Sequence, residues 1–278
     1  MEFRDAGTRC LWRIGILELS RHLFGKKGRF VLEFHGIFSH RSSKLPADAQ
    51  PGLSAEELST ILKWVGGRFR FLTPEEFLKG SAPGVLLTFD DGLASTFKCG
   101  VPILERYKAP AIFFVSTQHV PQPADWLPAN RKLADQYWPK GEFDEHTYEL
   151  FNGMDEKQLA KAGAHSLITV GCHTVSHPFL TQCDLSQLKY EIEASRQYLE
   201  DISGQRVDYF AYPTGDYDRS VAEAVMSAGY RAAFAELSKN IGLPAYEIPR
   251  VGIYRSETAY LAAKLSGLHQ KPVSTIYD

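Results

Sequence analysis

The sequence predicts an α/β fold, a barrel of mainly parallel strands in a single domain. From residue 30 onward, short apolar runs alternate with helical patterns. This repetition predicts parallel strands joined by right-handed crossovers, and about eight strands suit a β/α barrel. An open doubly wound sheet is the second interpretation, but no glycine fingerprint follows the first strand, which disfavours a dinucleotide-binding fold.

The predicted strands are short, apolar and rich in β-branched or aromatic residues, as strands buried on both faces should be. They span residues 31–35, 68–72, 85–89, 111–115, 167–172, 207–212, 230–234 and 248–253.

Helices are predicted between these strands. Ser54 and Glu57 form a capping box at the start of a helix over 53–64, and Asp184 begins another that ends at Gly204. Two further helices are predicted over 94–108, which Gly100 and Pro102 interrupt, and over 219–228, which Gly229 ends.

Residues 118–162 do not fit the alternation. The segment holds four prolines and several aromatic residues with little periodicity, and a connection that long is usually functional or an insertion. We interpret it as an excursion over the top of the domain that walls a substrate groove; a packed surface insertion is the alternative. No repeat or linker divides the chain, so residues 30–278 are predicted to form one catalytic domain.

Residues 1–29 are predicted to form a separate basic amphipathic arm. Residues 1–30 hold seven basic and three acidic side chains beside an apolar stripe. Such a helix can lie weakly on an anionic membrane surface or dock on its own domain. The arm lacks a clean signal-peptide pattern, and no run approaches the roughly 18 apolar residues of a membrane span, so a cytoplasmic location is expected.

Composition excludes several classes of function. Lys and Arg total 31 against 33 Asp and Glu, a net charge of −2 that lacks the basic field of a general nucleic-acid binder. The four cysteines are sparse and form no CxxC pair, so neither a disulfide framework nor a zinc–thiolate site is expected.

Two carboxylates follow the predicted strand 85–89. Asp90 and Asp91 are costly next to an apolar strand unless something pairs with them. Gly92 lets the backbone bend immediately after them, so that one can bind a metal while the other stays free. A turn with a solvated acid pair is the alternative.

Two histidines follow the predicted strand 167–172. His173 and His177 have the spacing to grip one metal from a helix, but Pro178 biases His177 away from the helical conformation. A loop at the strand end is therefore predicted, with both imidazoles converging on a metal together with the Asp-Asp pair. Cys172 is predicted to pack in the core, because its side chain points the other way in an extended chain.

A third cluster, residues 208–217, is an aromatic strand that ends in Pro213, Thr214 and Gly215. Backbone amides at such a bend can serve an oxyanion, and aromatic rings can stack on sugars. A strand followed by a simple Pro-Gly turn is the alternative.

Together these clusters resemble the successive motifs of the polysaccharide deacetylases, carbohydrate esterase family 4, also called the chitooligosaccharide-deacetylase homology domain. The resemblance covers residues 30–255 and agrees in order and spacing. The residues that carry it are Thr88-Phe89-Asp90-Asp91-Gly92, His173-Thr174-Val175-Ser176-His177-Pro178 and Phe210-Ala211-Tyr212-Pro213-Thr214-Gly215.

The resemblance implies a distorted (β/α)7-type barrel and a divalent metal, most often zinc. It implies that Asp90 is the catalytic base and that Asp91, His173 and His177 bind the metal. It also implies that the Tyr212-Pro213 segment contacts substrate, with a backbone amide near Tyr212 holding the oxyanion.

The sequence departs from the family pattern in two places. The third motif lacks the arginine that many members pair with the base, and Arg250, which follows Pro249, resembles an alternative arginine. A Leu-x-x-His motif is also missing, and His269 matches it poorly. His35, at the end of the first strand, is the candidate for a supporting or acid role; a merely structural histidine is the alternative.

The predicted function is a metal-dependent hydrolase that removes N-acetyl groups from a sugar of a glycan or glycan precursor. A second hypothesis keeps the site but changes the substrate to a formyl group, a small amide or an O-acetyl ester. A third is a glycan-binding domain that no longer turns its ligand over. The expected partner is an N-acetylated glycan, not a nucleic acid.

Overall fold

The computed structural model describes residues 28–46, 49–80, 82–266 and 273. The predicted N-terminal arm lies outside the described residues except for its last two, and His269 lies outside them too. The arm, its membrane contact and the domain boundary at residue 29 therefore stay predictions. Among the described residues, no helix combines the length and the apolar character needed to span a membrane.

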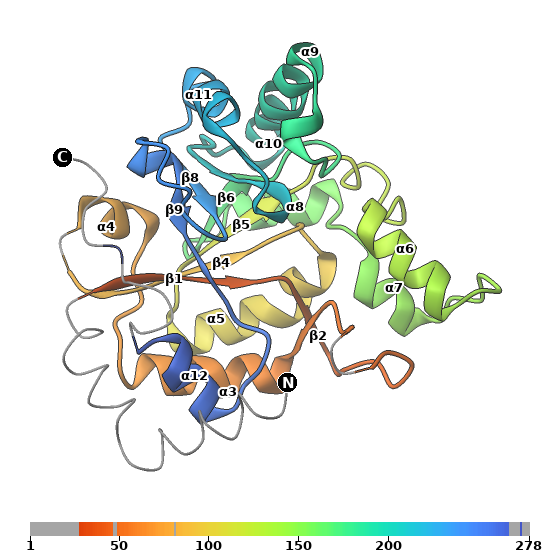
Figure 1. The fold of residues 1–278 in the computed structure, drawn as a ribbon. Helices are drawn as coiled ribbons and strands as arrows, with labels where there is room; N and C mark the ends of the chain where they lie inside the picture. Colours follow the sequence, from red (N-terminus) through yellow and green to blue (C-terminus); the bar gives the residue numbers. More distant parts are fainter. Residues whose placement is uncertain (1–27, 47–48, 81, 267–272, 274–278) are drawn as a thin grey trace.

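Eight parallel strands form one sheet in the order β10-β1-β4-β5-β6-β7-β8-β9 (Figure 1). Their bounds are β1 Arg29–Phe34, β4 Gly84–Phe89, β5 Ala111–Val115, β6 Ile168–Cys172, β7 Tyr209–Ala211, β8 Ala232–Ala235, β9 Ile248–Pro249 and β10 Val251–Gly252.

The two sheet edges, β9 and β10, are consecutive pieces of one segment that meet at Arg250. Pairing passes from β8 to β1 along this segment, because the Arg250 N–H donates to Ala235 O (2.9 Å) and the Ile253 N–H donates to Glu33 O (3.0 Å). The segment closes the sheet into a distorted barrel. The predicted (β/α)7-type architecture is confirmed, and the open doubly wound sheet is excluded.

Seven of the eight predicted strand segments contain strands. The prediction for residues 68–72 is wrong: only Phe71 pairs there, in a single bridge to Val85, within a short connection whose arginines are exposed. The sequence analysis missed β2 (Gly36–Phe38) and β3 (Gly52–Ser54), which pair with each other.

Alternation along the strands separates two apolar clusters. Outward-facing side chains such as Leu87, Phe113 and Val170 pack under the surrounding helices. Inward-facing side chains such as Leu86 and Ile112 fill the barrel from its amino end together with residues of α4. The apolar filling leaves the carboxyl end of the barrel interior to polar groups.

Helices surround the barrel as the sequence predicts, and the predicted caps at Ser54 and Asp184 are present as capping boxes. Two predicted helices each contain a π-helical turn, η2 and η4. The bounds are α3 Ala55–Gly66, α4 Pro74–Lys79, η2 Thr96–Gly100, α5 Val101–Tyr107, α8 Glu156–Gly163, η3 Leu180–Gln182, α9 Leu185–Lys189, η4 Tyr190–Ala194, α10 Ser195–Ser203, η5 Pro213–Gly215, α11 Arg219–Ser227, η6 Pro244–Tyr246 and α12 Thr258–Lys264.

The excursion contains two helices of its own, α6 (Pro128–Tyr137) and α7 (Glu145–Phe151), which stand at one side of the barrel (Figure 1). A separate apolar cluster around Trp126 and Trp138 holds the two helices against Phe38 at the end of β2. The segment is therefore packed, and its α6 side also reaches the cavity described below.

Candidate active site

The carboxyl end of the barrel carries buried charges on its inner face. Glu33 from β1, Asp90 after β4 and Arg250 between β9 and β10 are each 3% exposed or less. Charged groups this deeply buried are costly unless they pair with one another. Apolar packing does not explain why these three charged groups lie together, so they mark a candidate functional site.

Asp90 and Asp91 point to different sides because the chain turns sharply after β4. The Asp90 N–H still donates to Phe34 O (2.9 Å), which continues the strand ladder. The next two residues are left-handed, with φ of 72° at Asp91 and 73° at Gly92. A Cβ on Gly92 would lie 2.7 Å from a Val115 methyl, so the turn requires glycine. The predicted bend is confirmed, with Asp91 as its first left-handed residue.

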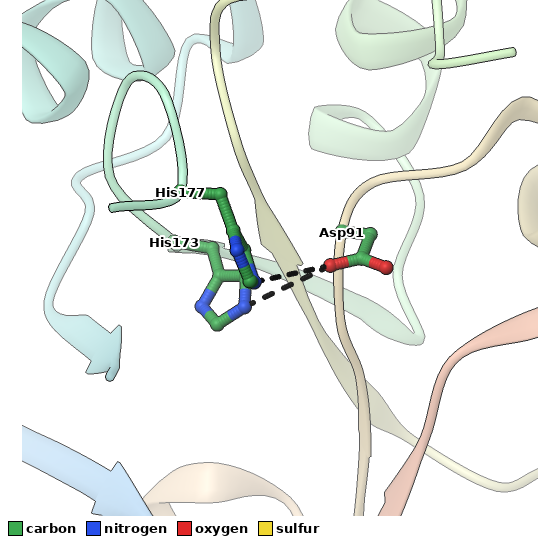
Figure 2. A group of neighbouring side chains, drawn as sticks. All are labelled: Asp91, His173 and His177. Carbon is green, nitrogen blue, oxygen red and sulfur yellow. Dashed lines mark ion pairs between the residues drawn. The ribbon is translucent and has the colours of Figure 1, made fainter. Parts of the chain in front are cut away.

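Asp91, His173 and His177 form one cluster, and Figure 2 shows both imidazoles directed at the Asp91 carboxylate. Asp91 Oδ1 lies 3.9 Å from His173 Nε2 and 3.7 Å from His177 Nε2. These separations exceed hydrogen-bond lengths, so the groups converge without bonding one another. Two imidazole nitrogens and one carboxylate oxygen are a donor set that suits zinc.

His173 is oriented as a metal ligand should be. Its Nδ1–H donates to Ala211 O (2.9 Å), which fixes the tautomer and leaves the Nε2 lone pair facing Asp91. Burial lowers the pKa of His173 to about 4, and the neighbouring carboxylates only partly oppose this effect. The imidazole is therefore neutral at pH 7, the form that binds metal.

Asp90 forms a bidentate ion pair with Arg250. Arg250 Nη1 and Nη2 donate to the two carboxylate oxygens of Asp90 at 2.7 and 2.8 Å. Burial alone would raise the pKa of Asp90, but the charge and hydrogen bonds of Arg250, helped by His173, hold it at about 2. The carboxylate is ionised at neutral pH and lies 3.9 Å from His173 Nε2.

His35 lies beside this pair. Side-chain atoms of Glu33, His35 and Asp90 fall within 4.8 Å of one another, and the His35 ring stacks near Tyr254. Burial would lower the pKa of His35, but the carboxylates of Asp91, Asp90 and Glu33 together raise it.

A cavity of about 1240 Å³ opens over these groups. This volume lies above the usual range of about 300–1,000 Å³ for small-molecule pockets. Leu127, Asn130 and Leu133 from the excursion form part of its wall. The predicted role of the excursion as a groove wall therefore agrees with the lining.

The third motif corrects one prediction. The Tyr212 N–H donates to Phe234 O (3.0 Å) between neighbouring strands, and Pro213 has no N–H to offer. Both side chains are buried away from the cavity, whose lining includes Thr214 and Gly215 instead. The strand ladder therefore already uses the Tyr212 amide itself, and an oxyanion donor elsewhere near Tyr212 stays a prediction.

Comparison with known proteins identifies the family. A sequence profile described as "Polysaccharide deacetylase" matches residues 78–233, more than half of the chain. The chain belongs to the polysaccharide deacetylase family. It is 26% identical over 265 residues to the poly-β-1,6-N-acetyl-D-glucosamine N-deacetylase of Staphylococcus aureus, a match that covers 88% of this chain and 81% of that protein.

Solved structures share the fold. The Streptococcus pyogenes deacetylase PplD in complex with acetate superposes with a TM-score of 0.65 at 20% identity, covering 86% of this chain and 98% of that one. IcaB from Ammonifex degensii gives a TM-score of 0.61 at 22% identity, covering 86% and 97%. This chain therefore shares the barrel fold of these two solved structures.

The sequence analysis did not predict two buried carboxylates at this site, those of Glu33 and Glu191. Glu33 lies 3.2 Å from Arg250 Nε, and Glu191 contacts the histidine loop. Glu33 had a signal, since it is the lone charge in the apolar run 30–34. Glu191 had none, because a glutamate in an amphipathic helix is ordinarily exposed.

Proposed function

We propose that this polysaccharide deacetylase removes N-acetyl groups from an N-acetylated glycan with a divalent metal held by Asp91, His173 and His177. The observation that carries the proposal is the approach of these three groups to a buried, Arg-paired carboxylate at the floor of one large cavity. The name of the Staphylococcus aureus relative supports a polymer of N-acetylglucosamine as the substrate class.

Three protein ligands are the number that catalytic zinc sites use. A zinc ion held by these residues would supply a Lewis acid that polarises an amide carbonyl and acidifies water. The neutral, hydrogen-bonded His173 and the adjacent Asp91 carboxylate are the protein's contribution to holding it.

Asp90 accepts a proton from the attacking water. Its pKa of about 2 keeps it ionised, and the Arg250 fork fixes the direction of its oxygens. A carboxylate held in this way is a positioned general base rather than a metal ligand. Arg250, at the junction of β9 and β10, thus takes the place of the missing arginine of the third motif.

His35 donates a proton to the departing nitrogen. The raised pKa of His35 favours the protonated form, and the side chain lines the same cavity as Asp90. Base and acid then flank the scissile amide, which lets one proton enter as another leaves. Glu33 faces both His35 and Arg250 and supports their positive charge.

Acetate release from a panel of N-acetylhexosamine oligosaccharides tests this function. We expect release that chelation abolishes and stoichiometric zinc restores. N-formyl and O-acetyl analogues in the same assay decide between deacetylation and the other hydrolytic activities. Zinc-loaded protein that releases no acetate from any N-acetylated member, yet binds the oligosaccharides, would overturn the proposal in favour of a glycan-binding domain.

A further inference from the structure

Glu191 lies beneath the loop that carries His177, in the π-helical turn η4. The residue is only 8% exposed. Oε2 accepts the backbone N–H groups of Val175 (2.8 Å) and Ser176 (2.9 Å), and Oε1 accepts the Ser176 hydroxyl (2.6 Å). The buried carboxylate is thus satisfied entirely by this loop.

The loop needs such an anchor because its backbone is strained. Thr174 and His177, on either side of the two anchored residues, have left-handed φ angles of 69° and 59°. Neither is glycine, and such residues persist only where the surroundings determine them. Within the loop, the His177 N–H donates to Thr174 Oγ1 (3.0 Å). Glu191 supplies the contacts from outside it.

Ser195, the first residue of α10 after this turn, reaches the strand before the loop. Its hydroxyl donates to Glu191 O (2.5 Å) and lies 3.0 Å from Cys172 Sγ at the end of β6. π-helical turns often occur at functional sites. Here Glu191 of the turn contacts the loop that carries His177, and the residue after the turn contacts the strand end that precedes His173.

We propose that Glu191 is a positioning residue of the metal centre: its carboxylate holds the 174–177 loop so that His177 Nε2 faces Asp91. The inference rests on the proposed metal site and adds to it a residue that touches neither metal nor substrate. Outer partners of metal ligands typically contribute a factor of about 10–100 in metal affinity.

Zinc affinity tests the proposal, measured by competition with a chromophoric chelator on the full chain. We expect Glu191→Ala to weaken zinc binding about 10–100-fold. Glu191→Gln keeps one oxygen acceptor and should weaken it less, and this variant retains the test if Glu191→Ala does not fold. Glu193→Gln is the matched control, since Glu193 lies on the same turn but is exposed, and its ion pair within the described part of the chain is with Lys189 (3.8 Å).

A second control separates positioning from general stability. Leu188→Ala truncates a buried side chain on the preceding turn that makes no bond to the loop, and it should destabilise the fold without changing zinc affinity. Wild-type affinity in both Glu191 variants, or an equal loss in Leu188→Ala, would overturn the proposal. A wild-type protein that binds no zinc would instead refute the metal centre itself.

Discussion

Asp90 and His177 both follow the carboxyl ends of barrel strands, but different kinds of contact hold them in place. Asp90 is fixed from inside the barrel by the guanidinium of Arg250, which lies at the junction of β9 and β10, beyond β1 in the strand order. His177 is fixed from outside by a helix whose glutamate binds backbone N–H groups of the histidine loop.

The difference follows from what each group must do. The proposed base has to stay ionised although it is buried, and the charge and hydrogen bonds of Arg250 offset the burial that raises its pKa. The histidines of the proposed metal site have to stay neutral and correctly aimed, and hydrogen bonds to backbone groups hold them and their loop in place. The site therefore has two halves. The base half, Asp90 with Arg250, depends on charge, and the metal half, Asp91 with His173 and His177, depends on geometry.

Asp90→Asn should break the base half with the largest effect. The amide is nearly isosteric, but it cannot accept the proton, so the rate should fall about 10²–10⁴-fold. Acetate release from zinc-saturated protein measures the loss, and far-ultraviolet circular dichroism checks the fold. Turnover near the wild-type rate would remove Asp90 from its role.

Arg250→Met should shift the pH dependence. Asp90 works as a base only when ionised, and its pKa is about 2 because Arg250 opposes the effect of burial. Without the guanidinium this pKa rises, and the acid limb of the pH–rate profile should move to higher pH once it exceeds the pKa of about 4 at which His173 becomes protonated. Breaking a buried ion pair should also lower the free energy of unfolding by about 3–5 kcal/mol.

Arg250→Lys is the control for this shift, since it keeps the charge but loses the planar fork. We expect its acid limb to move less than that of Arg250→Met. If both variants keep the wild-type limb, the charge of Arg250 does not set the ionisation of the base.

Thr96→Val should sharpen the comparison with a small effect near His35. Thr96, in the π-helical turn η2, donates to His35 O (3.2 Å) and accepts from the Ile37 N–H (3.3 Å). Valine keeps the shape but leaves both backbone groups unpaired, at a cost of about 1–3 kcal/mol in unfolding free energy. Urea denaturation should detect this, while exposed Thr60→Val should change nothing. A loss of zinc affinity in Thr96→Val would contradict the separation between the surroundings of the base and those of the metal ligands.

Much of the site could be predicted from the sequence because its chemistry is local. Gly92 directly follows Asp90 and Asp91, and His173 precedes a loop that ends in a proline. The sequence therefore predicts a turn after each of these two strands. Arg250 was also predictable, as a lone charge within an apolar strand that had to find a partner.

The remainder depends on which strands and helices become neighbours. The Tyr212 amide looked available, but β8 lies beside β7 and Phe234 O takes its proton. Residues 68–72 looked like a strand, but a single bridge to Val85 is all that they form. Glu191 gave no sequence signal because its contacts come from a loop some 15 residues earlier.

Zinc titration of Asp90→Asn and Asp91→Asn side by side tests the central claim most directly, because it asks whether two adjacent carboxylates have separate roles. By calorimetry, Asp90→Asn should bind one zinc per chain with nearly wild-type affinity, since Asp90 belongs to the Arg250 pair. Asp91→Asn should bind far more weakly, since it loses a ligand shared with His173 and His177. Equal affinity in the two variants, or a loss confined to Asp90→Asn, would contradict the division between base and metal ligand.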